Sequence, residues 1–210
     1  QRPPEPGKDN YFAKLVANVQ DPQAPHHALS IEHLLDMEPS KAPDDATREQ
    51  IVAAFRELAT GAGAGGGYGG SSSNSDAVRG LVIWAGEEVV PMLIELATGS
   101  SQAVDEAVLE GLARYPTSEG AAALAELVKE TQQLEAVTEA LGKMGPVAEE
   151  PLLALLPAES AAVNIAVINA LGQCGTKASL KIMRKAARSE NEEVAQAARD
   201  AAEAIRERAK

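Results

Sequence analysis

The sequence AVRGLVIWAGEEVVPMLIEL, residues 77–96, decides the fold. It contains two stretches with helical spacing of apolar residues, and Gly86 lies between them. Glycine accepts the left-handed backbone conformation that commonly ends a helix. The stretch therefore predicts two helices joined by a short turn at Gly86, with Leu81 and Leu93 buried where the helices pack.

The same pattern recurs about every thirty residues along the chain. Leu81 is followed by Leu112, Leu141 and Leu171, at spacings of 31, 29 and 30 residues. Twelve residues beyond these four positions lie Leu93, Leu124, Leu153 and Met183, and fifteen residues beyond them lie Leu96, Leu127, Leu156 and Ala186. A period of this length is typical of solenoids, so we predict an all-α fold with about twelve helices and no sheet. The predicted architecture is a right-handed α-solenoid of stacked antiparallel helix pairs.

Short signals mark the ends of the predicted helices. In the last full unit, Gly175 and Thr176 separate two helical stretches, and Thr176 is predicted to be the N-cap of the second. Pro91 and Pro151 lie slightly beyond the best-tolerated first helical position, so slight bends are expected there. The stretch NEEVAQAARDAAEAIRERAK, residues 191–210, is predicted to be a final helix that closes the stack.

The N-terminal part is less regular. Three helices are predicted within residues 11–19, 25–37 and 44–59, the last with Asp44 or Asp45 as its N-cap. We predict a Pro-rich linker over 1–9 and a single domain over 10–210, composed of irregular N-terminal units (10–60), a Gly/Ser-rich loop (60–75) and regular repeats (76–210).

Three stretches resemble HEAT-like repeats, in particular the short bacterial type related to those of phycobilin lyases. They are residues 77–96, LGKMGPVAEEPLLALL (141–156) and IAVINALGQCGTKASLKIM (165–183). The consensus of such units is similar to V-R-x-x-A-x-x-A-L-G-x-x-G followed by x-x-A-V-P-x-L-x-x-L. The resemblance covers residues 24–210 and is weakest before Asp76. It implies the α-solenoid fold and leaves the function open, because one fold carries many functions.

A glycine-rich stretch, TGAGAGGGYGGSSSNS (60–75), contains Gly61-x-Gly63-x-x-Gly66, the spacing of a dinucleotide-binding turn. Such a turn needs a strand before it and a helix N-terminus directly after it. Here a helical pattern precedes it, and polar residues follow it. We therefore predict a linker-like loop between two helix pairs.

Few residues are candidates for catalysis or metal binding. Cys174 is the only cysteine, which excludes an internal disulfide and a thiolate zinc cluster, and we expect it to pack as a small apolar side chain. His26, His33 and Asp36 share a predicted helix face, but their spacing lacks the tight patterns of metal ligands. We predict no catalytic residues, no metal site and no cofactor. Trp84 is predicted to lie in the core.

Charge is distributed unevenly. The net charge is −12, which disfavours nucleic acid and anionic membranes as partners over most of the surface. Residues 73–162 carry 15 acidic and 4 basic side chains, whereas residues 163–210 carry 6 acidic and 9 basic ones. The second helices of HEAT-like stacks line the concave surface, where partners dock. The candidate partner-binding residues are Pro91, Met92, Glu95, Glu126, Leu155, Lys181, Lys185 and Arg188, with Leu152 as a further apolar contact. The alternative is that these charges only keep the surface solvated.

The leading hypothesis is a non-catalytic scaffold that binds a protein segment and is a monomeric module of a larger protein. A lyase-type enzyme with the same repeat and a purely structural spacer are the alternatives. An aromatic-lined pigment pocket is disfavoured because aromatic residues are only 3% of the chain. The longest apolar candidate, residues 80–97, is interrupted by Glu87 and Glu88, so we expect no membrane insertion. We expect a soluble fragment of a longer or processed protein, in the cytoplasm or periplasm.

Overall fold

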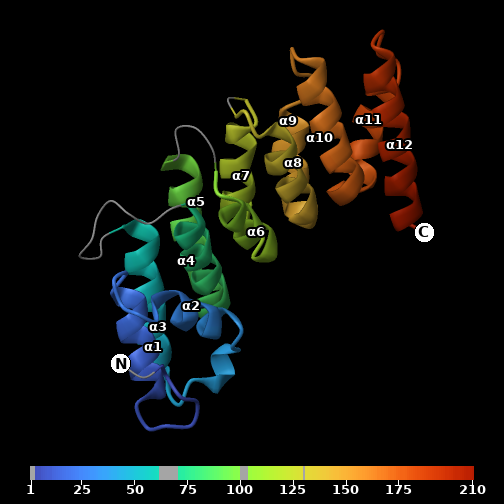
Figure 1. The fold of residues 1–210 in the computed structure, drawn as a ribbon. Helices are drawn as coiled ribbons and strands as arrows, with labels where there is room; N and C mark the ends of the chain where they lie inside the picture. Colours follow the sequence, from blue (N-terminus) through green and yellow to red (C-terminus); the bar gives the residue numbers. More distant parts are fainter. Residues whose placement is uncertain (1–2, 62–70, 100–103, 130) are drawn as a thin grey trace. The chain divides into compact units, whose positions relative to one another are not determined.

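The computed structural model describes residues 3–61, 71–99, 104–129 and 131–210 (Figure 1). Within these ranges the chain forms twelve α-helices and four short 3-10 helices, and no strand. The predicted all-α fold is therefore confirmed. The chain divides into two compact units, Gln1–Val89 and Val90–Lys210, and the boundary falls inside the first predicted repeat. The prediction of one domain over 10–210 stays a prediction.

Four helices build the N-terminal unit: α1 (Tyr11–Gln20), α2 (His27–Leu35), α3 (Asp45–Thr60) and α4 (Ser71–Trp84), with the 3-10 helices η1 (Pro39–Lys41) and η2 (Gly86–Val89). Helix α3 packs on α1 and α4, and α2 packs on α1 and α4. Asp44 is the N-cap of α3, since its Oδ1 accepts a hydrogen bond from Thr47 N at 2.7 Å. Trp84 is fully buried, as predicted, and its indole Nε1 donates to the carbonyl oxygen of Leu34 at 2.9 Å.

The glycine-rich stretch lies largely outside the described residues. Helix α3 ends at Thr60, and Gly61 follows it with a φ of 67°, the left-handed conformation of a helix C-terminus. Most of the predicted loop, residues 62–70, lies outside the described residues. Helix α4 begins at Ser71, so residues 71–75 are helical and not part of the predicted loop.

Eight helices build the C-terminal unit: α5 (Val90–Gly99), α6 (Glu106–Arg114), α7 (Ser118–Leu127), α8 (Leu134–Lys143), α9 (Glu149–Ala154), α10 (Ala161–Cys174), α11 (Leu180–Ala186) and α12 (Glu192–Arg208), with η3 (Gly145–Ala148) before α9 and η4 (Lys177–Ser179) before α11. First helices pack in a row, α6 on α8, α8 on α10 and α10 on α12. Second helices form another row, in which α5 packs on α7 and α7 on α9. Figure 1 shows α6 to α12 stacked in this order.

The thirty-residue register is confirmed at all four first-helix leucines. Leu81, Leu112, Leu141 and Leu171 are fully buried. In the second helices Leu93, Leu124 and Met183 are also fully buried, but in the third repeat the buried residue is Leu152, and Leu153 is only half-buried. The prediction is therefore wrong by one position there. Helix α9 thus presents Leu152 to the core where the other second helices present the residue twelve positions after their first-helix leucine.

The turns that precede the second helices explain the two prolines. Gly86 and Gly145 have φ values of 63° and 75°, as predicted for Gly86, and each opens a 3-10 turn that passes directly into an α-helix. Pro91 is the second residue of α5 and Pro151 the third of α9. Backbone N–H groups in the first turn of an α-helix have no intrahelical partner, so a proline there removes no hydrogen bond.

Two helical glycines give a matched test of close packing. A Cβ on Gly80 would lie 2.5–2.6 Å from ring carbons of Phe55, which is fully buried, whereas a Cβ on Gly142 would meet Oε1 of Gln173 at 2.7 Å, at the end of an exposed side chain. We expect Gly80→Ala to lower the free energy of unfolding by about 1–3 kcal/mol, because the buried ring cannot move away. Gly142→Ala should raise it by up to about 1 kcal/mol, because alanine favours helix. Urea unfolding measures both, and equal effects would contradict the packing of α3 on α4.

Candidate functional site

The predicted binding residues lie on second helices, and most of them reach solvent. Pro91, Glu95, Glu126, Lys181, Lys185 and Arg188 are exposed, and Met92 and Leu155 are half-buried. Leu152 is wholly buried and therefore cannot contact a partner, which corrects its assignment as an apolar contact. Packing brings α5, α7 and α9 together in one row, whereas α11 packs on α12.

The start of α11 is held by a carboxylate from the preceding repeat. Glu149, the first residue of α9, accepts hydrogen bonds from Thr176 N at 2.8 Å, from Thr176 Oγ1 at 3.1 Å and from the hydroxyl of Ser179. Burial alone would raise the pKa of Glu149, but the hydrogen bonds from Ser179 and Thr176 outweigh burial and hold the pKa below its usual value. Thr176 is also the predicted N-cap, since its hydroxyl accepts from Ala178 N.

The end of α10 is held by a cation from the following helix. Arg208 of α12 donates from Nη1 to the carbonyl of Gly172 and from Nη2 to the carbonyl of Gly175, the latter at 2.9 Å. Unpaired carbonyls at a helix C-terminus attract cations, as the N–H groups at a helix N-terminus attract anions. Glu149 and Arg208 therefore fix the turn between α10 and α11 from two sides, and with it the direction of α11.

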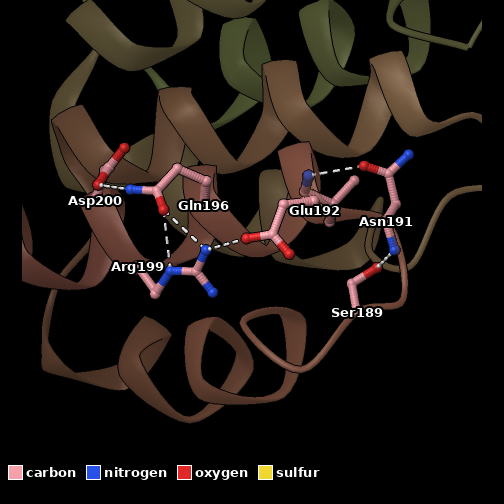
Figure 2. Close-up of polar contacts among 7 residues, drawn as sticks. Ser189, Asn191, Glu192, Gln196, Arg199 and Asp200 are labelled. Carbon is pink, nitrogen blue, oxygen red and sulfur yellow. Dashed lines mark hydrogen bonds and ion pairs between the residues drawn. The ribbon is translucent and has the colours of Figure 1, made fainter.

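Exposed basic residues that form no ion pair are concentrated in α11 and in the short segments on either side of it. Lys177, Lys181, Arg184, Lys185 and Arg188 are all exposed, and within the described ranges none of the five forms an ion pair. The neighbouring helix α12 differs (Figure 2). There the guanidinium of Arg199 lies 2.9 Å from a carboxylate oxygen of Glu192 and also donates to Gln196, which in turn donates to Asp200. On α12 the charge of Arg199 is thus paired with a carboxylate, whereas the five basic residues above form no ion pair among the described residues.

A groove of about 330 Å³ lies between the first helices α6 and α8. Apolar and charged side chains line the groove. They are Glu106, Leu109, Glu110, Ala113, Arg114, Ala136, Glu139, Ala140 and Lys143. Lys143 Nζ lies 2.7 Å from Glu139 Oε1, and this contact, with the charges of Glu110 and Glu106, raises the pKa of Lys143. None of the predicted site residues lines the groove. A sequence signal for it exists, because Glu110/Arg114 and Glu139/Lys143 repeat the same acid–base pair 29 residues apart.

The stacking of α8 to α12 coincides with a match to a known family. Residues 130–206 match the family model of HEAT repeats. This segment, about a third of the chain, is similar to HEAT repeats. The match confirms the predicted HEAT-like resemblance and, with the helical stacking, the α-solenoid fold. No curated protein and no solved structure matches the chain. HEAT repeats are commonly scaffolds for protein interaction and are typically not enzymes.

The cysteine and two of the histidines each have a defined environment in the structure. Cys174 is buried, and its burial, with the nearby charge of Glu149, raises its pKa to about 11. A thiol with this pKa is protonated at neutral pH and is a poor nucleophile. In the N-terminal unit, His27 Nδ1 lies 2.8 Å from the carbonyl of Asn18, and His33 Nδ1 lies 3.3 Å from the Tyr11 hydroxyl. Among the described residues no three His, Cys, Asp or Glu side chains form a group that could hold a metal ion. Nor does any described helix have the length and apolarity needed to cross a membrane.

Proposed function

We propose that this chain is a non-catalytic scaffold that binds a protein segment along its second helices. One observation carries the proposal: exposed positions on successive second helices change from Glu95 and Glu126 to Lys181, Lys185 and Arg188. Half-buried apolar side chains offer apolar contact: Met92 lies one turn before Glu95 on α5, and Leu155 follows α9, between Glu126 and Lys181 in the sequence. The common use of HEAT repeats as interaction scaffolds supports the same conclusion.

The charges set the expected chemistry of the partner. A segment that follows the second helices would carry basic residues toward α5 and α7 and acidic residues toward α11. Complementary charges of this kind mainly fix orientation and increase the rate of association. Exposed charges are screened over about 8–10 Å near physiological ionic strength, so binding is expected to weaken as salt is added.

The test begins with crosslinking in the native cell, with this chain as bait, and continues with charge reversal. We expect Glu95→Lys combined with Glu126→Lys to lower the affinity for a captured partner by about tenfold and to reduce the salt dependence of binding. The companion variant, Lys181→Glu with Lys185→Glu, should act in the same way. These changes keep helix propensity nearly constant, so the fold should survive.

A matched control distinguishes the effect of charge at the proposed surface from the effect of the protein's net charge. Glu203→Lys with Glu207→Lys on the exposed face of α12 changes the net charge as much as the first variant does. It should leave partner affinity almost unchanged. If the control weakens binding as strongly as the variants of the second helices, or if no variant alters the affinity, the proposed surface is wrong.

A further inference from the structure

The exposed side of α11 is a continuous basic surface. Five exposed cations, which we call the basic face, lie on α11 and directly beside it: Lys177 in η4, Lys181, Arg184 and Lys185 in α11, and Arg188 in the turn after α11. Their spacing of four, three, one and three residues keeps them on one side of a helix. Met183 on the other side is fully buried, and Ile182 is half-buried. The cations therefore point to solvent because the apolar side chains hold α11 against the rest of the unit.

The basic face lies in a stretch of the chain without acidic residues, and the nearest ones in the sequence are Glu159 and Glu190. Residues 160–189 contain no aspartate or glutamate. In the region that the structure describes, the ion pairs join Asp76 to Arg79, Glu126 to Lys129, Glu139 to Lys143 and Glu192 to Arg199, and none of them involves α11. Glu149, the carboxylate that contacts the start of α11, is engaged by Thr176 and Ser179. Five like charges thus repel one another across about three helical turns without compensation, in a protein whose net charge is −12.

We propose that the basic face binds a short acidic segment of a partner protein, a proposal that rests on the binding function proposed above. From Lys177 to Arg188 the face is about 17 Å long, at about 1.5 Å per helical residue. An extended chain covers this length with about five residues, at about 3.3 Å per residue. Arg184 and Arg188 are one turn apart, so each can engage one carboxylate in a two-pronged contact, while the lysines act as point charges.

Length and surrounding charge favour a peptide segment over nucleic acid or an anionic membrane. Duplex DNA carries one negative charge about every 1.7 Å and extends well beyond a face of this size. Helix α12, which packs on α11, exposes acidic side chains, among them Glu193, Asp200 and Glu203, and the net charge of the protein is −12. A long polyanion or a membrane plane extends past the basic face onto a predominantly acidic surface and is repelled there. A segment no longer than the basic face avoids that surface.

The test uses a fluorescein-labelled, capped hexaglutamate peptide as the probe and a capped hexaglutamine peptide as its neutral counterpart. Binding to the full chain is measured by fluorescence anisotropy at about 0.15 M salt, the usual physiological range. We expect saturable binding of hexaglutamate and none of hexaglutamine. Lys181→Gln with Lys185→Gln should raise the dissociation constant about fivefold, the effect of two exposed ion pairs of ordinary strength.

The matched control removes the same charge at another place. Arg206→Gln with Lys210→Gln also deletes two exposed cations, outside the basic face, and should change the dissociation constant less than about twofold. Circular dichroism checks that both variants keep their helices. Equal weakening in the two variants, absence of saturable hexaglutamate binding, or equal binding of hexaglutamine would overturn the proposal. So would tighter binding of a duplex DNA or of phosphatidylserine vesicles than of hexaglutamate.

The hexaglutamate experiment and the charge reversals on α5 and α7 test the two proposals separately, so either proposal can be rejected without the other. Hexaglutamate binding depends on α11 alone, whereas the scaffold proposal requires a partner that also contacts Glu95 and Glu126. Hexaglutamate binding without any effect of reversing Glu95 and Glu126 would retain the acidic ligand and reject the longer binding surface. Loss of partner binding on reversal of these two glutamates, without hexaglutamate binding, would retain the longer surface and reject the acidic ligand.

Discussion

Replacing Trp84 with alanine is expected to lower the free energy of unfolding by about 3–5 kcal/mol, the range for deletion of a large buried aromatic side chain. Trp84 is 1% exposed and belongs to the core of the N-terminal unit with Leu34, Phe55 and Leu81. The substitution also leaves the carbonyl of Leu34 without its hydrogen-bond donor. Urea unfolding followed by circular dichroism measures the effect, since the only tryptophan of the chain is removed.

Trp84→Phe separates the two contributions. Phenylalanine keeps much of the buried apolar area but cannot donate to Leu34, so it should cost about 1–3 kcal/mol, the range for a buried acceptor left unsatisfied. A loss below about 1 kcal/mol for Trp84→Ala would place this side chain outside the core.

The second large effect concerns the third repeat, where neighbouring leucines have different environments. Leu152→Ala is expected to lower the free energy of unfolding by about 2–5 kcal/mol, and Leu141→Ala by a similar amount, because both side chains are 0% exposed. Leu153→Ala should cost less than about 1.5 kcal/mol, because a half-buried leucine loses less contact and leaves no closed cavity. Chemical unfolding of the three variants side by side gives the order.

The Leu152 and Leu153 pair is its own control, because the two substitutions remove the same atoms from the same helix. A larger loss at Leu153 than at Leu152 would restore the uniform twelve-residue spacing and contradict the position of α9. A loss near zero at Leu141 would contradict the thirty-residue register itself.

The repeat could be predicted because burial recurs with it. A leucine in each first helix must fill the same space between helix layers, so Leu81, Leu112, Leu141 and Leu171 appear at nearly constant spacing. Helix ends were predictable where one residue determines the local geometry, as at Asp44, Gly86 and Thr176. These signals act over a few residues and need no knowledge of the tertiary fold.

Other features depend on contacts between distant segments. The inward face of α9 is one of them, because apolar periodicity alone does not distinguish Leu152 from Leu153. The contact of Glu149 with Thr176 and Ser179 joins two repeats, so neither sequence segment indicates it separately. The groove between α6 and α8 likewise needs both helices in place. The basic residues of α11 were visible in the sequence, but their lack of ion-pair partners was not.

The turn between α10 and α11 limits how the array can be re-engineered. Its backbone groups form hydrogen bonds with Glu149 of α9, in the preceding pair, and with Arg208 of α12. Residues 161–188 are consequently not a repeat unit that can be exchanged on its own. Grafted into another array, they would leave Thr176 N–H and the Gly172 and Gly175 carbonyls to find new partners. A designer who lengthens this protein by duplicating that pair must also copy a glutamate upstream and an arginine downstream.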